Sequence, residues 1–148
     1  RQDINDFYIC SLSSRTITYK GMLKSSALQA YFVDLNNPRY KIQYGLWHRR
    51  FSTNTLPKWP LAQPFRYIGH NGEINTIQGN YNWATARSST FEHPNFGHRI
   101  QEVLPPMQPG TSDSGNLDNY LELMIRCNRQ LPEASGSPLW AARGLYWG

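Results

Sequence analysis

The most regular pattern in the sequence lies in residues 116–129. Apolar side chains recur there at spacings of three and four residues, the period of one face of an α-helix. They are Leu117, Tyr120, Leu121, Met124 and Ile125. Asp118 stands in the first turn, where a negative charge suits the helix dipole. A helix with one apolar face must bury that face against another element, so this segment needs a partner elsewhere in the chain.

Short stretches rich in β-branched and aromatic residues provide such partners. Residues 7–12 and 16–19, separated by Ser13-Ser14-Arg15, predict a β-hairpin. Residues 40–47 predict a strand that carries His48 and Arg50 at its end, and residues 65–68 predict a shorter one.

Helices and loops are predicted for the remaining segments. Residues 25–32 predict a short helix capped by Ser25, and residues 75–87 predict a second helix that tolerates Gly79. Turn and loop residues gather at 36–38, 53–63, 88–97 and 105–114. The order of the predicted strands and helices along the chain indicates an α+β fold in which helices pack on an antiparallel sheet.

The chain has 148 residues, which suits one domain, and it has no initiating Met, so we expect it to begin inside a longer protein. It contains no run of about 18 apolar residues, which excludes a membrane-spanning helix. The net charge is +5, but the basic residues are scattered, so we interpret them as a solvated surface rather than a nucleic-acid site. Cys10 and Cys127 lie too far apart in sequence for a zinc motif, and two cysteines are too few for a disulfide framework, which favours a reducing, intracellular setting.

Arg50 is the first candidate for a binding role. A guanidinium can meet a carboxylate with two parallel hydrogen bonds, and Ser52 and Thr53 place hydroxyl groups beside it. Strand alternation puts Arg49 on the opposite, solvent-facing side. The alternative is that Arg50 is an exposed arginine on an edge strand.

Asn71 and Gly72 are the second candidates. A side-chain amide and a backbone N–H after a tight turn can both point at a developing oxyanion. The alternative is a type I′ hairpin turn, which Asn-Gly strongly favours. Asp113, in a loop of small residues, could receive an ammonium group, but it could equally cap a helix or close an Asx turn.

Cys10 is a poor candidate for a nucleophile. It lies inside an apolar pattern, where cysteine usually acts as a small buried hydrophobic residue. His48 and His70 raise the possibility of a Cys-His pair, yet we interpret both as structural histidines. The residues therefore predict a site that grips the backbone end of an amino acid beside an oxyanion hole.

Several ordered blocks carry a resemblance to a known family. They are residues 7–15, 19–23, 50–55, 59–64, 69–76, 79–83, 111–114 and 117–119. In these blocks the chain resembles the glutaminase domain of the glutamate synthase large subunit, a class II glutamine amidotransferase. The similarity covers residues 6–132, nearly the whole chain.

The resemblance implies an N-terminal-nucleophile hydrolase fold, a four-layer αββα sandwich of two antiparallel sheets, here incomplete at both ends. It also implies hydrolysis of L-glutamine to glutamate and ammonia. By the same resemblance Arg50 binds the glutamine carboxylate, Thr53 contributes a hydroxyl, Asn71 and Gly72 form the oxyanion hole, and Asp113 receives the ammonium.

For the full-length enzyme, the resemblance implies FMN, an iron–sulfur cluster and reductive amination of 2-oxoglutarate. The partners are then the synthase and central domains of the same chain and, as electron donor, an NAD(P)H-linked small subunit or ferredoxin. No cofactor or metal is expected in the 148 residues themselves. The expected location is the cytoplasm, or the plastid stroma in a photosynthetic eukaryote.

Two departures from the family pattern matter. The family's nucleophile is a cysteine at the mature N-terminus, whereas this sequence starts at Arg1 and Cys10 matches an internal strand position. We therefore expect the chain alone to be inactive. Residues 1–134 match a partial amidotransferase domain, and residues 135–148 form an atypical tail. The alternative function is a catalytically dead amino-acid-binding or scaffold module.

Overall fold

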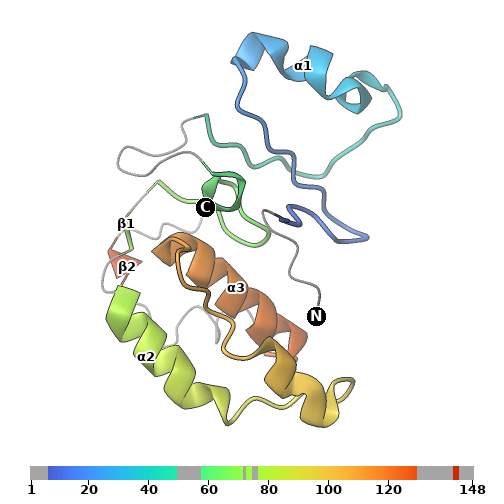
Figure 1. Cartoon of the computed structure of the whole chain (residues 1–148). Coiled ribbons are helices and arrows are strands. Elements are labelled where there is room, and N and C mark those ends of the chain that lie inside the picture. Colours follow the sequence, from blue (N-terminus) through green and yellow to red (C-terminus); the bar gives the residue numbers. More distant parts are fainter. Residues whose placement is uncertain (1–6, 50–57, 72, 75–76, 130–141, 144–148) are drawn as a thin grey trace.

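A computed structural model describes residues 7–49, 58–71, 73–74, 77–129 and 142–143. Two helices dominate it, α2 (Ile77–Ser88) and α3 (Asp113–Arg126). Both begin near the short strand β1 (Glu73–Ile74) and lie side by side (Figure 1). Arg87, in the last turn of α2, and Cys127, just after α3, line one cavity. The two helices therefore run in the same direction.

Helix α3 is the centre of the core. Its predicted apolar face is confirmed at Leu117, Tyr120, Leu121 and Met124, which are buried, while Ile125 is only partly buried. The helix occupies residues 113–126 rather than 116–129. It starts early because the Ser112 side chain provides the N-cap.

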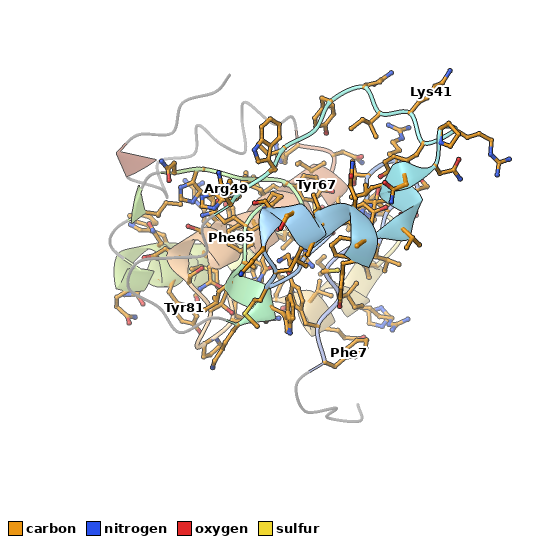
Figure 2. All side chains as sticks on the ribbon, turned by 90° about the horizontal axis from the view of Figure 1, so that it is seen from above. Phe7, Lys41, Arg49, Phe65, Tyr67 and Tyr81 are labelled. Carbon is orange, nitrogen blue, oxygen red and sulfur yellow. The ribbon has the colours of Figure 1, made fainter. Side chains whose placement is uncertain are left out.

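The partners of α3 come from several elements. Ala84 of α2 is buried against it, and the ring of Phe91 meets the ring of Tyr120 edge-on at a centroid distance of 6.0 Å. The remaining buried members of the core are Phe65, Ile68, Ile74 and Met107. Figure 2 shows Phe65 among the central side chains, whereas Phe7 and Lys41 project at the periphery.

The predicted hairpin at 7–19 is present as a pair of neighbouring segments but not as two strands. The backbone N–H of Thr18 donates to Ser11 Oγ at 3.0 Å, and Cys10 Sγ lies 3.5 Å from the carbonyl oxygen of Thr18. Ser13 Oγ accepts from the backbone N–H groups of Arg15 and Thr16, which forms the predicted turn. Side chains thus take backbone groups that a strand ladder would use.

Two other strand predictions are wrong within the described residues. Residues 40–47 run without a strand partner, and Tyr44, Leu46 and Trp47 are exposed. Residues 65–68 form a tight turn, closed by a 2.8 Å hydrogen bond from the Phe65 N–H to the Ile68 carbonyl. The turn forms because a carboxylate of α3 takes the N–H groups that a strand would offer to its neighbour.

The helix predicted at 25–32 is split into short turns. They are η1 (Ser25–Ala27), α1 (Leu28–Tyr31) and η2 (Val33–Asn36), and no side chain caps them, so the Ser25 cap was a wrong prediction. The turn at 36–38 is confirmed by hydrogen bonds from Arg39 and Tyr40 to Asn37. The two further 3₁₀-helices are η3 (Trp59–Leu61) and η4 (Gly97–Val103).

The sheet content of the described residues is one antiparallel pair. Strand β1 pairs with β2 (Ala142–Arg143), with Glu73 opposite Arg143 and Ile74 opposite Ala142. The described residues therefore display helices, turns and a short sheet, but not the two stacked sheets of the expected sandwich. No helix in these ranges is long and apolar enough to cross a bilayer.

Candidate functional site

The turn that carries Asn71 is fixed from two sides. The backbone N–H of His70 donates a 2.7 Å hydrogen bond to Gln63 Oε1. Gly69 lies directly against Leu46, since a Cβ at residue 69 would approach Leu46 Cδ2 to 2.8 Å. Only glycine permits this approach without a shift of Leu46. The segment that leads toward Arg50 therefore meets the turn before Asn71.

A hydrogen bond joins this turn to the start of α3. His70 Nε2 lies 2.7 Å from Ser114 Oγ, although the two residues are 44 positions apart in sequence. Asn71 follows His70, and Asp113 precedes Ser114. The structure thus brings the candidate oxyanion donor and the candidate ammonium acceptor to one end of the helix pair.

Asp113 is the first residue of α3, and its side chain is partly buried. Its Oδ1 is buried and has no hydrogen-bond partner among the residues that the structure describes. Burial raises the pKa of the Asp113 carboxyl above its ordinary value. The alternative of a capping aspartate loses its support, because Ser112 Oγ accepts from the Gly115 N–H at 3.1 Å and is the cap.

A second carboxylate holds the neighbouring turn in place. Asp118 is 2% exposed and accepts hydrogen bonds from the backbone N–H groups of Arg66, Tyr67 and Ile68 at 3.1, 2.7 and 3.0 Å. The sequence suggested only a dipole role for this residue. Its position next to Leu117 on the apolar face could have indicated that Asp118 is buried. A buried carboxylate needs hydrogen-bond partners.

Three predicted site residues, Arg50, Thr53 and Gly72, lie outside the described residues. Arg49 is exposed, in agreement with its predicted solvent-facing position. The Asn71 side chain is also exposed. The hairpin alternative for Asn71 is not what the described residues show, because the strand after the turn pairs with residues 142–143.

The described contacts of Cys10 and His48 give no support to a Cys-His pair. Cys10 is partly buried, and its Sγ lies near the Thr18 carbonyl rather than a histidine. His48 is partly buried, and its Nδ1 forms no hydrogen bond with any described residue. Ser114 was not singled out from the sequence, and nothing in its immediate sequence signals its contact with His70.

A cavity of about 350 Å³ lies at the opposite end of the two helices. It is lined by Arg87 of α2, by Tyr120 and Met124 of α3 and by the segments that follow each helix, and none of the predicted site residues lines it. The described part of the chain contains no group of three or more His, Cys, Asp or Glu side chains that could hold a metal ion.

Known proteins are similar to this chain over most of its length. A profile of the family described as "Glutamine amidotransferases class-II" matches residues 1–136. The large chain of the NADPH glutamate synthase of Azospirillum brasilense is 50% identical over 131 residues, which is 88% of this chain and 9% of that protein. The chloroplastic ferredoxin-dependent glutamate synthase of Oryza sativa subsp. japonica is 53% identical over 130 residues, 88% of this chain and 8% of that protein.

A third relative is similar to the chain to the same extent. The ferredoxin-dependent glutamate synthase 2 of a Synechocystis strain is 52% identical over 131 residues, again 88% of this chain and 8% of the relative. The chain thus spans less than a tenth of these relatives. With the profile matching all but its last 12 residues, the chain belongs to the class-II glutamine amidotransferase family.

Proposed function

We propose that the chain is the glutamine-binding part of the glutaminase region of a glutamate synthase. The observation that carries the proposal is the contact between His70 and Ser114, because these residues are the sequence neighbours of Asn71 and Asp113. The buried Asp113 Oδ1 supports it, since this oxygen has no hydrogen-bond partner among the described residues and an ammonium group is a donor that suits a carboxylate. The similarity to glutamate synthases favours this function over the alternative of a catalytically dead binding or scaffold module.

Each proposed group meets a different part of glutamine. Asp113 receives the α-ammonium, Arg50 pairs with the α-carboxylate through its two-pronged guanidinium, and Thr53 adds a hydroxyl contact. Asn71 and the backbone N–H of Gly72 face the oxygen of the γ-amide. An oxyanion donor of this kind contributes about 2.7–4 kcal/mol in the transition state.

The chemistry requires a thiolate from a cysteine at a mature N-terminus, as the family resemblance implies. Its sulfur attacks the γ-carbonyl carbon, and the oxygen becomes negative beside Asn71 and Gly72. The carbon–nitrogen bond then breaks, the nitrogen takes a proton and ammonia leaves. Water cleaves the resulting thioester to give glutamate and the free thiol.

The wider setting follows from the relatives. In the intact enzyme we propose that the ammonia serves reductive amination of 2-oxoglutarate in a synthase region that holds FMN and an iron–sulfur cluster. The electrons would come from an NAD(P)H-linked small subunit or ferredoxin. We propose a cytoplasmic location, or the plastid stroma for a photosynthetic eukaryote, as the name of the rice relative suggests.

Calorimetry with L-glutamine tests the binding proposal. The folded 148-residue chain should bind glutamine, and Arg50→Ala and Asp113→Asn should each weaken binding at least tenfold, since each removes a charge-assisted contact. The matched controls are Arg49→Ala and Glu102→Gln, which change exposed residues. Equal losses in the site variants and the controls, or no heat with a folded sample, would contradict the proposal.

An ammonia-release assay tests the proposed inactivity of a polypeptide made of these 148 residues alone. Release should equal the buffer blank, because binding and oxyanion groups cannot form a thioester without a nucleophile. Cys10→Ala is the informative variant. Glutamine turnover by the wild-type sequence that disappears in Cys10→Ala would show that Cys10 is the nucleophile after all.

A further inference from the structure

The contact between His70 and Ser114 has a consequence for substrate choice. His70 is the residue before the candidate oxyanion donor, and Ser114 is the residue after the candidate ammonium acceptor. Their 2.7 Å hydrogen bond is therefore a short link between the two ends of the proposed site. Either the hydroxyl or the ring can be the donor, and in both cases the bond fixes the turn relative to α3.

Both partners of this bond are themselves held. Gln63 Oε1 accepts from the His70 N–H at 2.7 Å, and Asp118 immobilises the preceding residues 66–68. Ser114 lies in the first turn of α3, two residues after its Ser112 cap. A link between two fixed elements sets a distance, whereas a link to a mobile loop would not.

We propose that His70 and Ser114 are positioning residues that set the separation between the ammonium end and the amide end of the site, and so select glutamine over the shorter asparagine. The inference rests on the proposed glutamine-binding function. Glutamine and asparagine carry the same end groups and differ by one methylene. A site with its ends at a fixed separation can satisfy only one of them, because misplacement by about 1 Å is enough to lose a productive contact.

The test measures the affinities of the full 148-residue chain for L-glutamine and L-asparagine by calorimetry, in wild type and in His70→Phe, Ser114→Ala and the double variant. The breaking variants should lower the preference for glutamine about tenfold, the factor that corresponds to one lost hydrogen bond. The double variant should be no worse than either single one, because both remove the same bond. His70→Gln and Ser114→Thr keep a polar atom at each position and should retain most of the preference.

A merely structural role would act differently. General destabilisation weakens binding of both amino acids by the same factor and leaves their ratio unchanged. The matched controls His98→Phe and Ser26→Ala change exposed residues and should leave the ratio at the wild-type value. Thermal unfolding of each variant establishes that it is folded, and Ser114→Ala keeps the test decisive where His70→Phe does not fold.

The outcomes separate the two proposals. An unchanged glutamine-to-asparagine ratio in a folded Ser114→Ala variant overturns the positioning role while the binding function stands. The same holds for additive losses in the double variant. Absence of glutamine binding in the folded wild-type chain overturns the proposed function and the positioning role together.

Discussion

The backbone N–H of Tyr67 donates a 2.7 Å hydrogen bond to Asp118 Oδ1, which connects the turn before the candidate site to the middle of α3. The same carboxylate accepts from the N–H groups of Arg66 and Ile68, and Arg66 Nε lies 3.5 Å from its Oδ2. Three backbone donors and a guanidinium compensate the burial of the charge. The position of His70 two residues further along therefore depends on Asp118.

Replacement of Asp118 by asparagine should lower the free energy of unfolding by about 2 kcal/mol, because hydrogen bonds to a charged acceptor become bonds to a neutral one. The amide N–H₂ of the new side chain would also face backbone donors. Urea unfolding measures the change. Glu92→Gln, at an exposed position, is the control and should alter stability by less than about 0.5 kcal/mol.

Gly115 is a position in α3 where alanine should destabilise rather than stabilise. A Cβ there would lie 2.6 Å from Thr111 Cγ2 and 3.6 Å from Phe65 Cε1. Overpacking of a buried position costs about 1–3 kcal/mol, which exceeds the helix-propensity gain of about 1 kcal/mol from glycine to alanine.

Urea unfolding of Gly115→Ala should show this net loss, and adding Thr111→Ser, which removes the clashing methyl, should restore part of it. Gly45→Ala is the matched control, since its new Cβ would meet only Ile42 Cδ1 at an ordinary 3.5 Å. If Gly115→Ala is as stable as wild type, the described packing around the α3 N-terminus is wrong.

Helix α3 was predictable from sequence because its signal is local. The spacing of Leu117, Tyr120, Leu121 and Met124 specifies a buried face without reference to the rest of the chain. The strands were not predictable, because a strand forms only where another segment of the chain pairs with it. Residues 40–47 have the composition of a strand, yet no described segment pairs with them.

The candidate site, like the fold, was predictable only where the signal is local. Asp113 could be chosen from its residue type and from the family resemblance, and its Oδ1 is buried without a hydrogen-bond partner among the described residues. Its binding role stays a prediction. The link between His70 and Ser114 crosses 44 positions, and no local pattern specifies such a contact. Membership of the family implies the N-terminal-nucleophile hydrolase fold, while its stacked sheets stay a prediction for the complete domain.

Lys20 gives the stability a pH dependence in the alkaline range. Its Nζ lies 3.0 Å from Tyr8 Oη, 3.2 Å from the Trp59 carbonyl oxygen and 5.4 Å from the centroid of the Phe65 ring. Burial lowers the pKa of Lys20 to about 8 from an ordinary 10.5. The folded state therefore disfavours the charged form, and this penalty is fully present below pH 8.

The penalty should disappear as the pH rises from about 8 toward 10.5, where the unfolded chain also loses the proton. Urea unfolding at pH 7.5 and 9.5 should show wild type gaining stability relative to Lys20→Met, which keeps the aliphatic length without the charge. Comparison with this variant cancels the titration of Tyr8 and Cys127, whose pKa values burial raises. A constant difference between the two proteins would contradict the role of Lys20.

Asp113 should show opposite effects on stability and on binding. Because burial raises the pKa of its carboxyl, the ionised form is disfavoured in the free folded protein, and the penalty is present at neutral pH and relieved in acid. Asp113→Asn should therefore be at least as stable as wild type at pH 7. It should nevertheless bind glutamine far more weakly, since a neutral amide cannot pair with an ammonium group.

The pH dependence of binding distinguishes this role from a structural one. Calorimetry between pH 4 and 7 should show wild-type affinity for glutamine falling with decreasing pH, starting above the range of an ordinary aspartate because the pKa of the free site is raised. Uptake of one proton limits the slope to about tenfold per pH unit. Asp113→Asn should have a flatter profile, because the proton-binding group is gone. A variant with the wild-type slope would assign the pH dependence to another group and remove Asp113 from the ammonium site.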